Sequence, residues 1–150
     1  MNQSEVTKNS KDLIYLISCA VNNVSPDAQR CSQIDDEAVY SLAARHMLSA
    51  AAAFALEKVM TLPQHWLNAK GNSKRRLVIY QAERSRLLRE LDRRGIWYLP
   101  LKGILIKDMY PDASMREMSD NDILCDAEKM SEVREVMESL GFTCVEFGKQ

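Results

Sequence analysis

The feature that most constrains the fold is a change in hydrophobic period at Gly95. Before this glycine, apolar residues recur every three or four positions, which is typical of amphipathic helices. After it, short apolar runs are separated by turn residues in an order that predicts strand, helix, strand, helix, strand. The sequence therefore predicts a mixed α/β chain of the α+β class, with a helical region over residues 1–95 and the first part of an α/β core over residues 96–150.

Two long helices are predicted in the helical region. One covers residues 35–60, with Asp35 or Asp36 as its N-cap. The other covers residues 73–95, with Ser73 as its N-cap and a glycine at its C-terminal end. In the C-terminal part, the predicted strands cover residues 96–101, 119–125 and 142–147, and the predicted helices cover residues 104–110 and the segment that follows Asp126.

Within the 35–60 helix, two features suggest how its surface is used. His46 falls on the apolar face, where a hydrogen-bonded core histidine is expected rather than a catalytic one. The alanines at 50–53 have no bulk, so we expect a neighbouring helix to approach closely there.

An apolar run over residues 13–21 is less than half the roughly 20 residues that span a bilayer, so no transmembrane helix is expected. Residues 16–19 resemble a lipoprotein cleavage box, but the apolar core before it is shorter than a signal peptide uses. A buried helix is the favoured alternative. The four cysteines form neither a Cys-x-x-Cys pair nor a zinc spacing, and we interpret them as reduced thiols of a cytoplasmic protein.

Charge is uneven along the chain, although the total is −1 at pH 7 and gives no argument for nucleic-acid binding. Residues 70–107 carry eleven basic and three acidic groups, and residues 108–150 carry four basic and eleven acidic groups. This order suits a metal-bound polyanion, but solvated helix faces also produce it and are the more common cause. RNA binding by the basic helix is a third hypothesis, which is not favoured because Tyr80 is the only aromatic residue of residues 70–94.

The main chemical signal is the Asp-x-Asp pair of Asp120 and Asp122. In the predicted strand 119–125, residues i and i+2 point to one face about 6.5 to 7 Å apart, so the two carboxylates can hold one Mg²⁺ or two adjacent ions. An EF-hand is excluded because Cys125 stands at its turn-glycine position and Ser131 at its glutamate position.

Three further elements precede this pair in register. In order, the four are Leu-Lys-Gly at 101–103, Tyr-Pro at 110–111, Arg116, and Asp-x-Asp followed by Ile-Leu at 120–124. In order and spacing they resemble the motif of an uncharacterised bacterial nucleotidyltransferase family of the polymerase-beta-like nucleotidyltransferase superfamily. The resemblance is strongest over residues 96–125.

The resemblance implies an enzyme that transfers a nucleoside monophosphate from an NTP to an acceptor with Mg²⁺ or Mn²⁺. It implies that Asp120 and Asp122 are the catalytic metal ligands and that Lys102, Gly103 and Arg116 bind the triphosphate. A glycine at a strand-to-helix turn lets phosphates approach backbone N–H groups, and the cations supply charge. Structural alternatives stay open: Lys102 supporting the short helix, Gly103 relieving a tight turn, and Arg116 pairing with either carboxylate.

Two departures separate this sequence from the superfamily pattern. Lys102-Gly103 stands where Gly-Ser is usual, and Asp120 follows Gly103 by seventeen residues, a longer spacing than usual. A third carboxylate is expected on a later strand, and Glu146 comes too soon after the preceding helix. We therefore expect a fragment or a short member. The alternative function is a non-catalytic nucleotide-binding or regulatory module that keeps the fold.

The sequence leaves the partners of the protein open. A small molecule, a protein side chain and a nucleic-acid end are all acceptable acceptors, and nothing indicates which base the nucleotide carries. A sheet edge exposed after Phe147 would favour pairing with a second copy of the chain. No membrane partner is expected.

Overall fold

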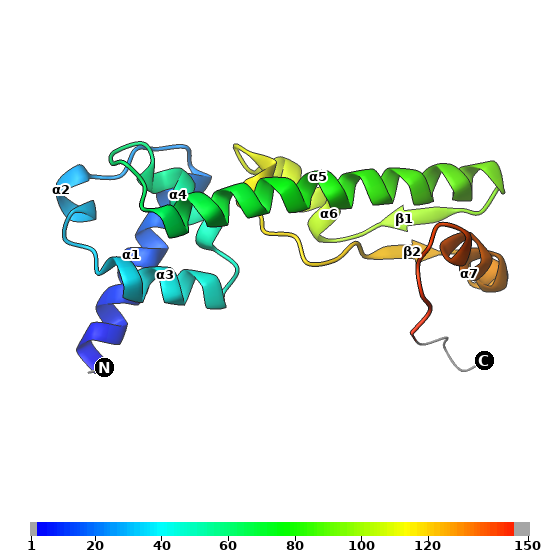
Figure 1. The fold of residues 1–150 in the computed structure, drawn as a ribbon, viewed down its shortest axis with the longest axis horizontal. Coiled ribbons are helices and arrows are strands. Elements are labelled where there is room, and N and C mark those ends of the chain that lie inside the picture. Colours follow the sequence, from blue (N-terminus) through cyan, green and yellow to red (C-terminus); the bar gives the residue numbers. More distant parts are fainter. Residues whose placement is uncertain (1–2, 146–150) are drawn as a thin grey trace.

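A computed structural model describes residues 3–145, and one long helix organises it. This helix, α5 (Gln64–Arg93), is about 45 Å long at 1.5 Å per residue and extends past two separate groups of elements (Figure 1). Four helices pack at its N-terminal end, and a two-stranded sheet with one helix packs at its C-terminal end. The α+β class is confirmed, with helices dominating the described residues.

The N-terminal group buries most of its apolar residues around one alanine-rich helix. Its elements are α1 (Gln3–Val21), α2 (Ala28–Cys31), α3 (Asp36–Arg45) and α4 (Ser49–Leu56). All eight residues of α4 are buried, and α4 packs against α1, α3 and α5. The absence of bulky side chains therefore permits the close approach that the sequence predicts.

The prediction of one helix over residues 35–60 is wrong, because the chain turns between α3 and α4. Met47 has φ +56°, and Leu48 N–H donates 2.8 Å to the carbonyl of Ala43, so a left-handed residue ends α3. The turn also moves His46 to the C-cap of α3, where it is exposed and does not belong to the core. The expected N-cap of this region is confirmed, since the Asp35 carboxylate accepts from Ala38 N–H at 3.1 Å.

The predicted start of the second helix is also wrong. Helix α5 begins at Gln64, directly after Pro63, and continues through Gly71. Ser73 therefore lies inside the helix and is buried. The predicted end is correct, since Gly95 follows with φ +63°.

The C-terminal group forms a second core. Strands β1 (Tyr98–Pro100) and β2 (Ile123–Cys125) pair antiparallel, with Leu99 opposite Leu124. Helix α7 (Met130–Ser139) follows the 3-10 turn η3 (Ala127–Lys129). The buried apolar residues of this core come from α5, from the segment before β1 and from α7: Leu87, Leu91, Ile96, Val133 and Val136.

The residues expected to begin and end the helix after Asp126 are confirmed at both ends. The Asp126 carboxylate accepts 3.0 Å from Glu128 N–H, and Gly141 follows the helix with φ +91°. Both strands are shorter than predicted, since each pairs over only three residues. The strand predicted over residues 142–147 is not formed at residues 142–145, and the rest of it lies outside the described residues.

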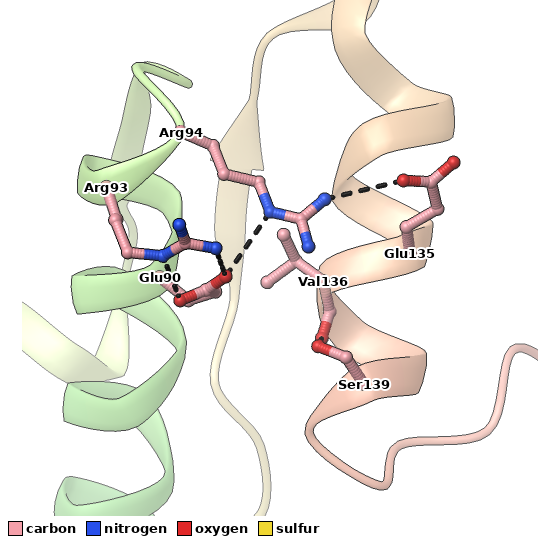
Figure 2. A network of polar contacts seen from close by, with 6 residues as sticks. All are labelled: Glu90, Arg93, Arg94, Glu135, Val136 and Ser139. Atoms are coloured by element: carbon pink, nitrogen blue, oxygen red, sulfur yellow. Dashed lines mark hydrogen bonds and ion pairs between the residues drawn. The ribbon is translucent and has the colours of Figure 1, made fainter.

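An ion-pair network fastens α5 to α7 (Figure 2). Arg93 makes two hydrogen bonds to the Glu90 carboxylate, at 2.6 and 2.9 Å. Arg94 lies 3.3 Å from the same carboxylate and 3.4 Å from Glu135 on α7. The C-terminal end of α5 is therefore joined to α7 by an ion pair as well as by apolar packing.

The apolar run 13–21 lies in helix α1. Leu16 and Cys19 are buried in the N-terminal core, as a helix of the folded domain requires. No helix within residues 3–145 is long and apolar enough to cross a bilayer.

Candidate functional site

The turn that joins β1 to α6 (Gly103–Ile106) places Lys102 in an unusual conformation. Lys102 has φ 47° and ψ −116°, a region that favours glycine. Its side chain is 73% exposed, and its Nζ lies 3.0 Å from Oδ2 of Asp122. Strain of this kind in a non-glycine residue persists where the surroundings enforce it, and it is common at functional sites.

Backbone and side-chain contacts both join this turn to Asp122. Leu101 N–H donates 2.9 Å to the carbonyl of Asp122, which extends the pairing of β1 and β2 by one bond. The hydrogen bond from Lys102 to Asp122 and the charge of Asp122 raise the pKa of Lys102, and the charge of Asp120 adds to the rise. Both acidic residues of the motif therefore act on the lysine of the turn.

Gly103 has a role that differs from turn relief. Its φ is not positive, so the strained backbone of the turn belongs to Lys102 instead. A Cβ at Gly103 would lie 2.8 Å from Nη2 and 3.0 Å from Nε of Arg116. The guanidinium therefore occupies the space that any side chain at position 103 would take.

Arg116 carries an unused donor. Its Nε is buried and has no hydrogen-bond partner among the described residues. Among residues 3–145, Arg116 forms no ion pair with Asp120 or Asp122, so that structural alternative is not supported. A buried guanidinium N–H without a partner costs free energy unless a ligand completes it.

Asp120 and Asp122 both precede β2, which begins at Ile123. The argument that a strand aligns them on one face is therefore wrong, since both lie in the loop before the strand. Within the described part of the chain, no group of three or more His, Cys, Asp or Glu residues is arranged to hold a metal ion. The donor set at this position is the pair of carboxylates, one of them bonded to Lys102.

The loop that carries Arg116 and Asp120 is held along one face of α5. Four side chains at three- and four-residue spacing donate to it from successive turns of the helix. The bonds run from Ser73 to the Ser114 carbonyl at 2.7 Å, from Arg76 to the Met118 carbonyl at 3.4 Å, from Tyr80 to the Ser119 carbonyl at 2.7 Å, and from Arg84 to Oδ1 of Asn121 at 3.1 Å.

Sequence reasoning missed these four positioning residues. The signal was present, because polar residues recur at 73, 76, 80 and 84 on one side of the helix. Arg76 and Arg84 belong to the basic segment 70–107, for which a polyanion site and solvated helix faces are the alternatives from the sequence. In the structure they bond the loop instead, which gives the basic helix a structural use.

Two acidic side chains of the same loop form hydrogen bonds that stabilise it. Asp112 accepts from Ser114 N–H at 2.8 Å and from Ser114 Oγ at 2.6 Å. Burial raises the pKa of Asp112, but the two hydrogen bonds and the charge of Lys74 outweigh this, so the pKa lies below its ordinary value. Glu117 accepts 2.8 Å from Ala50 N–H and caps the N-terminus of α4.

The structure therefore brings the five predicted site residues together in two contacts. Lys102 meets Asp122, with Asp120 close enough to contribute to the raised pKa of Lys102, and Gly103 meets Arg116. Because Lys102 and Gly103 are consecutive, the two contacts adjoin. The β1–α6 turn lies at the centre of the arrangement, with the loop 112–122 around it.

Comparison with known proteins identifies the family of the chain. No match was found among curated proteins or among solved structures. The model of a family described as uncharacterised nucleotidyltransferase matches residues 32–149, a range that includes the C-terminal core and every residue of the site but not α1. The chain belongs to this uncharacterised nucleotidyltransferase family.

Proposed function

We propose that this protein binds an NTP together with Mg²⁺ or Mn²⁺ and transfers the nucleoside monophosphate to a hydroxyl-bearing acceptor. Family membership supports nucleotidyl transfer as the reaction class. The observation that carries the proposal is the convergence of two cations and two carboxylates on the β1–α6 turn. Such a set suits a metal-bound triphosphate, because the carboxylates take the cation and the basic groups take the phosphates.

The chain's residues divide the task of binding between them. Arg116 has a buried N–H group without a partner in the described residues, which a phosphate oxygen would complete. Lys102 is largely exposed and can move from Asp122 to a phosphate. Gly103 lets the guanidinium and a ligand approach the backbone closely.

The two carboxylates fit the implied metal ion. Mg²⁺ is commonly held by one or two carboxylates, with substrate phosphates and water completing six ligands. Asp120 and Asp122 supply that number of carboxylates, and they lie next to the lysine that would face the phosphates. When bound, the ion would stabilise the charge that develops on the phosphate oxygens.

The proposed reaction forms one bond at the α-phosphorus and breaks another. The acceptor oxygen forms a bond to the α-phosphorus, and the bond from that phosphorus to the oxygen of the β-phosphate breaks. Pyrophosphate leaves with the bonding electron pair, and the hydroxyl proton passes to solvent. Arg116 and Lys102 hold the triphosphate in position while charge moves towards the leaving group.

Calorimetric titration of the chain with ATP, GTP, CTP and UTP, with and without Mg²⁺, tests the proposal. We expect metal-dependent binding that the double variant Asp120→Asn with Asp122→Asn loses while circular dichroism is unchanged. The matched control is Glu128→Gln with Glu132→Gln, which removes the same charge from exposed positions at the start of α7. Equal binding by the two double variants would refute the assigned roles.

One observation favours a second candidate, a nucleotide-binding module without catalysis. Asp122 is neutralised by Lys102, and no third acidic ligand joins the pair within the described residues. This candidate predicts the same binding but no pyrophosphate release. Pyrophosphate release from Mg²⁺-bound NTP, with a panel of hydroxyl-bearing acceptors, separates the two functions.

A further inference from the structure

A hollow of about 240 Å³ adjoins the candidate site on the side of Arg116. We call it the Arg116 hollow. Arg116 and Ser119 contribute polar atoms to its wall, and Met47, Leu48 and Met115 contribute apolar surface. Glu117 also lines it, but its carboxylate already accepts from Ala50 N–H. Arg116 is therefore the charged group that the hollow offers to a ligand.

A second hollow of about 280 Å³ meets the first. Its wall is almost wholly apolar, with Leu13, Ile14 and Leu42 among its residues, and we call it the Ile14 hollow. The two hollows share Ile17, His46 and Leu48. One continuous surface thus changes from apolar at α1 to polar at the loop that carries Arg116.

The position of the Arg116 hollow connects it to the proposed chemistry. Arg116 touches Gly103 of the β1–α6 turn and also lines the hollow. Ser119, at the edge of the hollow, directly precedes Asp120. A molecule in the hollow would therefore lie beside the triphosphate that the turn is proposed to bind.

We propose that the two hollows together hold the acceptor, a small amphipathic molecule with an anionic group and a hydroxyl; this rests on the proposed function. The apolar part fills the Ile14 hollow, and the anionic group and the hydroxyl lie together at the polar end, where the anionic group meets Arg116 and the hydroxyl faces the triphosphate. Each hollow alone is below the roughly 300 Å³ at which ligand pockets begin, and together they fall within the usual range. That size suits a small molecule and leaves a macromolecular acceptor without support.

Methionine methyl signals provide the test, because methionines lie both inside and outside the hollows. In the chain labelled with ¹³C-methyl methionine, Met47 and Met115 report on the Arg116 hollow, and Met130 and Met137 report on a separate hollow beside α7. The probe is mandelate, which has a ring at one end and, at the other, a carbon that carries both a hydroxyl and a carboxylate. We expect saturable shifts at the first pair of methionines and none at the second.

Two comparisons sharpen the test. The analogue 1-phenylethanol lacks the carboxylate and should bind about tenfold more weakly, as loss of a hydrogen bond to a charged group implies. Ile14→Asp places a charge in the apolar hollow and should weaken the probe at least tenfold. Val78→Asp is its matched control, since Ile14 is 68% exposed, Val78 is 65% exposed, and Val78 lines neither hollow.

The outcomes separate this inference from the function on which it rests. Equal shifts at all four methionines, no saturation, or equal weakening by Ile14→Asp and Val78→Asp would overturn the assignment of the hollows. Magnesium-dependent ATP binding is measured on the same samples and should be the same in wild type and Ile14→Asp. Absence of ATP binding from the wild-type chain would overturn the acceptor role and the proposed function, even if the probe binds.

Discussion

The guanidinium of Arg116 lies where a side chain at Gly103 would stand, with Nη2 at 2.8 Å from the position of a Cβ. Glycine at this position therefore provides room for the arginine and does not relieve the backbone. The open space of the turn therefore lies at Gly103, and its backbone strain lies at Lys102.

Gly103→Ala should weaken NTP binding without unfolding the protein. The added methyl group meets the far end of a flexible side chain, so Arg116 can move aside at little cost in stability. The displaced guanidinium then loses its proposed phosphate contact, and we expect about a tenfold loss of affinity, typical of one charged hydrogen bond. Calorimetry with Mg²⁺ and ATP measures the affinity, and urea unfolding measures the stability.

Gly71→Ala is the matched control for this variant. Gly71 lies within α5, and a Cβ there would meet nothing within 4 Å. The substitution should stabilise the protein by about 0.5 to 1 kcal/mol, because alanine loses less backbone entropy in a helix. Unchanged affinity in Gly103→Ala, or an equal loss in Gly71→Ala, would contradict a role for the contact with Arg116.

The contact between Lys102 and Asp122 should be visible in the titration of the lysine. Because Asp122 raises the pKa of Lys102, Asp122→Asn should lower it towards the ordinary value of 10.5. The stabilisation that the pair provides is present below that ordinary value and is lost as pH rises through the raised pKa. NMR titration of the Lys102 side chain checks the direction, and no change in Asp122→Asn would refute the pairing.

Many of the helix ends were predictable because they depend on contacts between residues that are close in the sequence. Asp35 and Asp126 bond backbone N–H groups three and two residues ahead, and Gly95 and Gly141 adopt the positive φ that ends a helix. These features need no knowledge of distant residues. The α+β class follows from the same local signals.

Long-range contacts account for the errors. Ser73 is a residue type that commonly caps helices, but its hydroxyl donates a hydrogen bond to the carbonyl of Ser114, which is 41 residues away in the sequence. The turn at Met47 separates two helices without a glycine or a proline, so no local signal marks it. Asp120 lies outside β2 because α5 holds the preceding loop, which sequence periodicity does not show.

The site was predictable as a set of residues and not as a geometry. The resemblance selected Lys102, Gly103, Arg116, Asp120 and Asp122, and the structure groups them around one turn. Only the structure shows that Lys102 pairs with Asp122 and that Gly103 packs against Arg116. Neither a positive φ at a lysine nor a guanidinium packed against a glycine produces a recognisable sequence pattern. Their functions stay predictions until nucleotide binding is measured.

Ser73→Ala should destabilise the protein and loosen the loop that carries Arg116. The hydroxyl of Ser73 is buried and donates 2.7 Å to the Ser114 carbonyl, so its removal leaves a buried acceptor without this partner. We expect a loss of about 1 to 3 kcal/mol in the free energy of unfolding, the usual cost of an unsatisfied buried group. Urea unfolding at pH 7 measures it.

The control for Ser73→Ala comes from the same helix. Ser85 is exposed, and its hydroxyl bonds the carbonyl of Gln81 one turn before it. Ser85→Ala should change stability by less than about 0.5 kcal/mol, because water replaces the bond and alanine favours the helix. A similar decrease in the free energy of unfolding of both variants would show that the hydrogen bond from Ser73 to Ser114 stabilises the protein no more than the exposed one does.

Glu90 should make the free energy of unfolding depend on pH below about 4.5. Hydrogen bonds from Arg93 and then Arg94 lower the pKa of Glu90 from 4.5 to about 2, although partial desolvation opposes them. A carboxyl group with a lowered pKa stabilises the fold above its ordinary pKa, and this contribution is lost as pH falls through the lowered value. Glu90→Gln should therefore be less stable than wild type at pH 6, and the difference should narrow between pH 4.5 and about pH 2. Urea unfolding across this range checks the expectation, and a difference that does not depend on pH would show that the ion pairs of Glu90 in Figure 2 do not stabilise the fold.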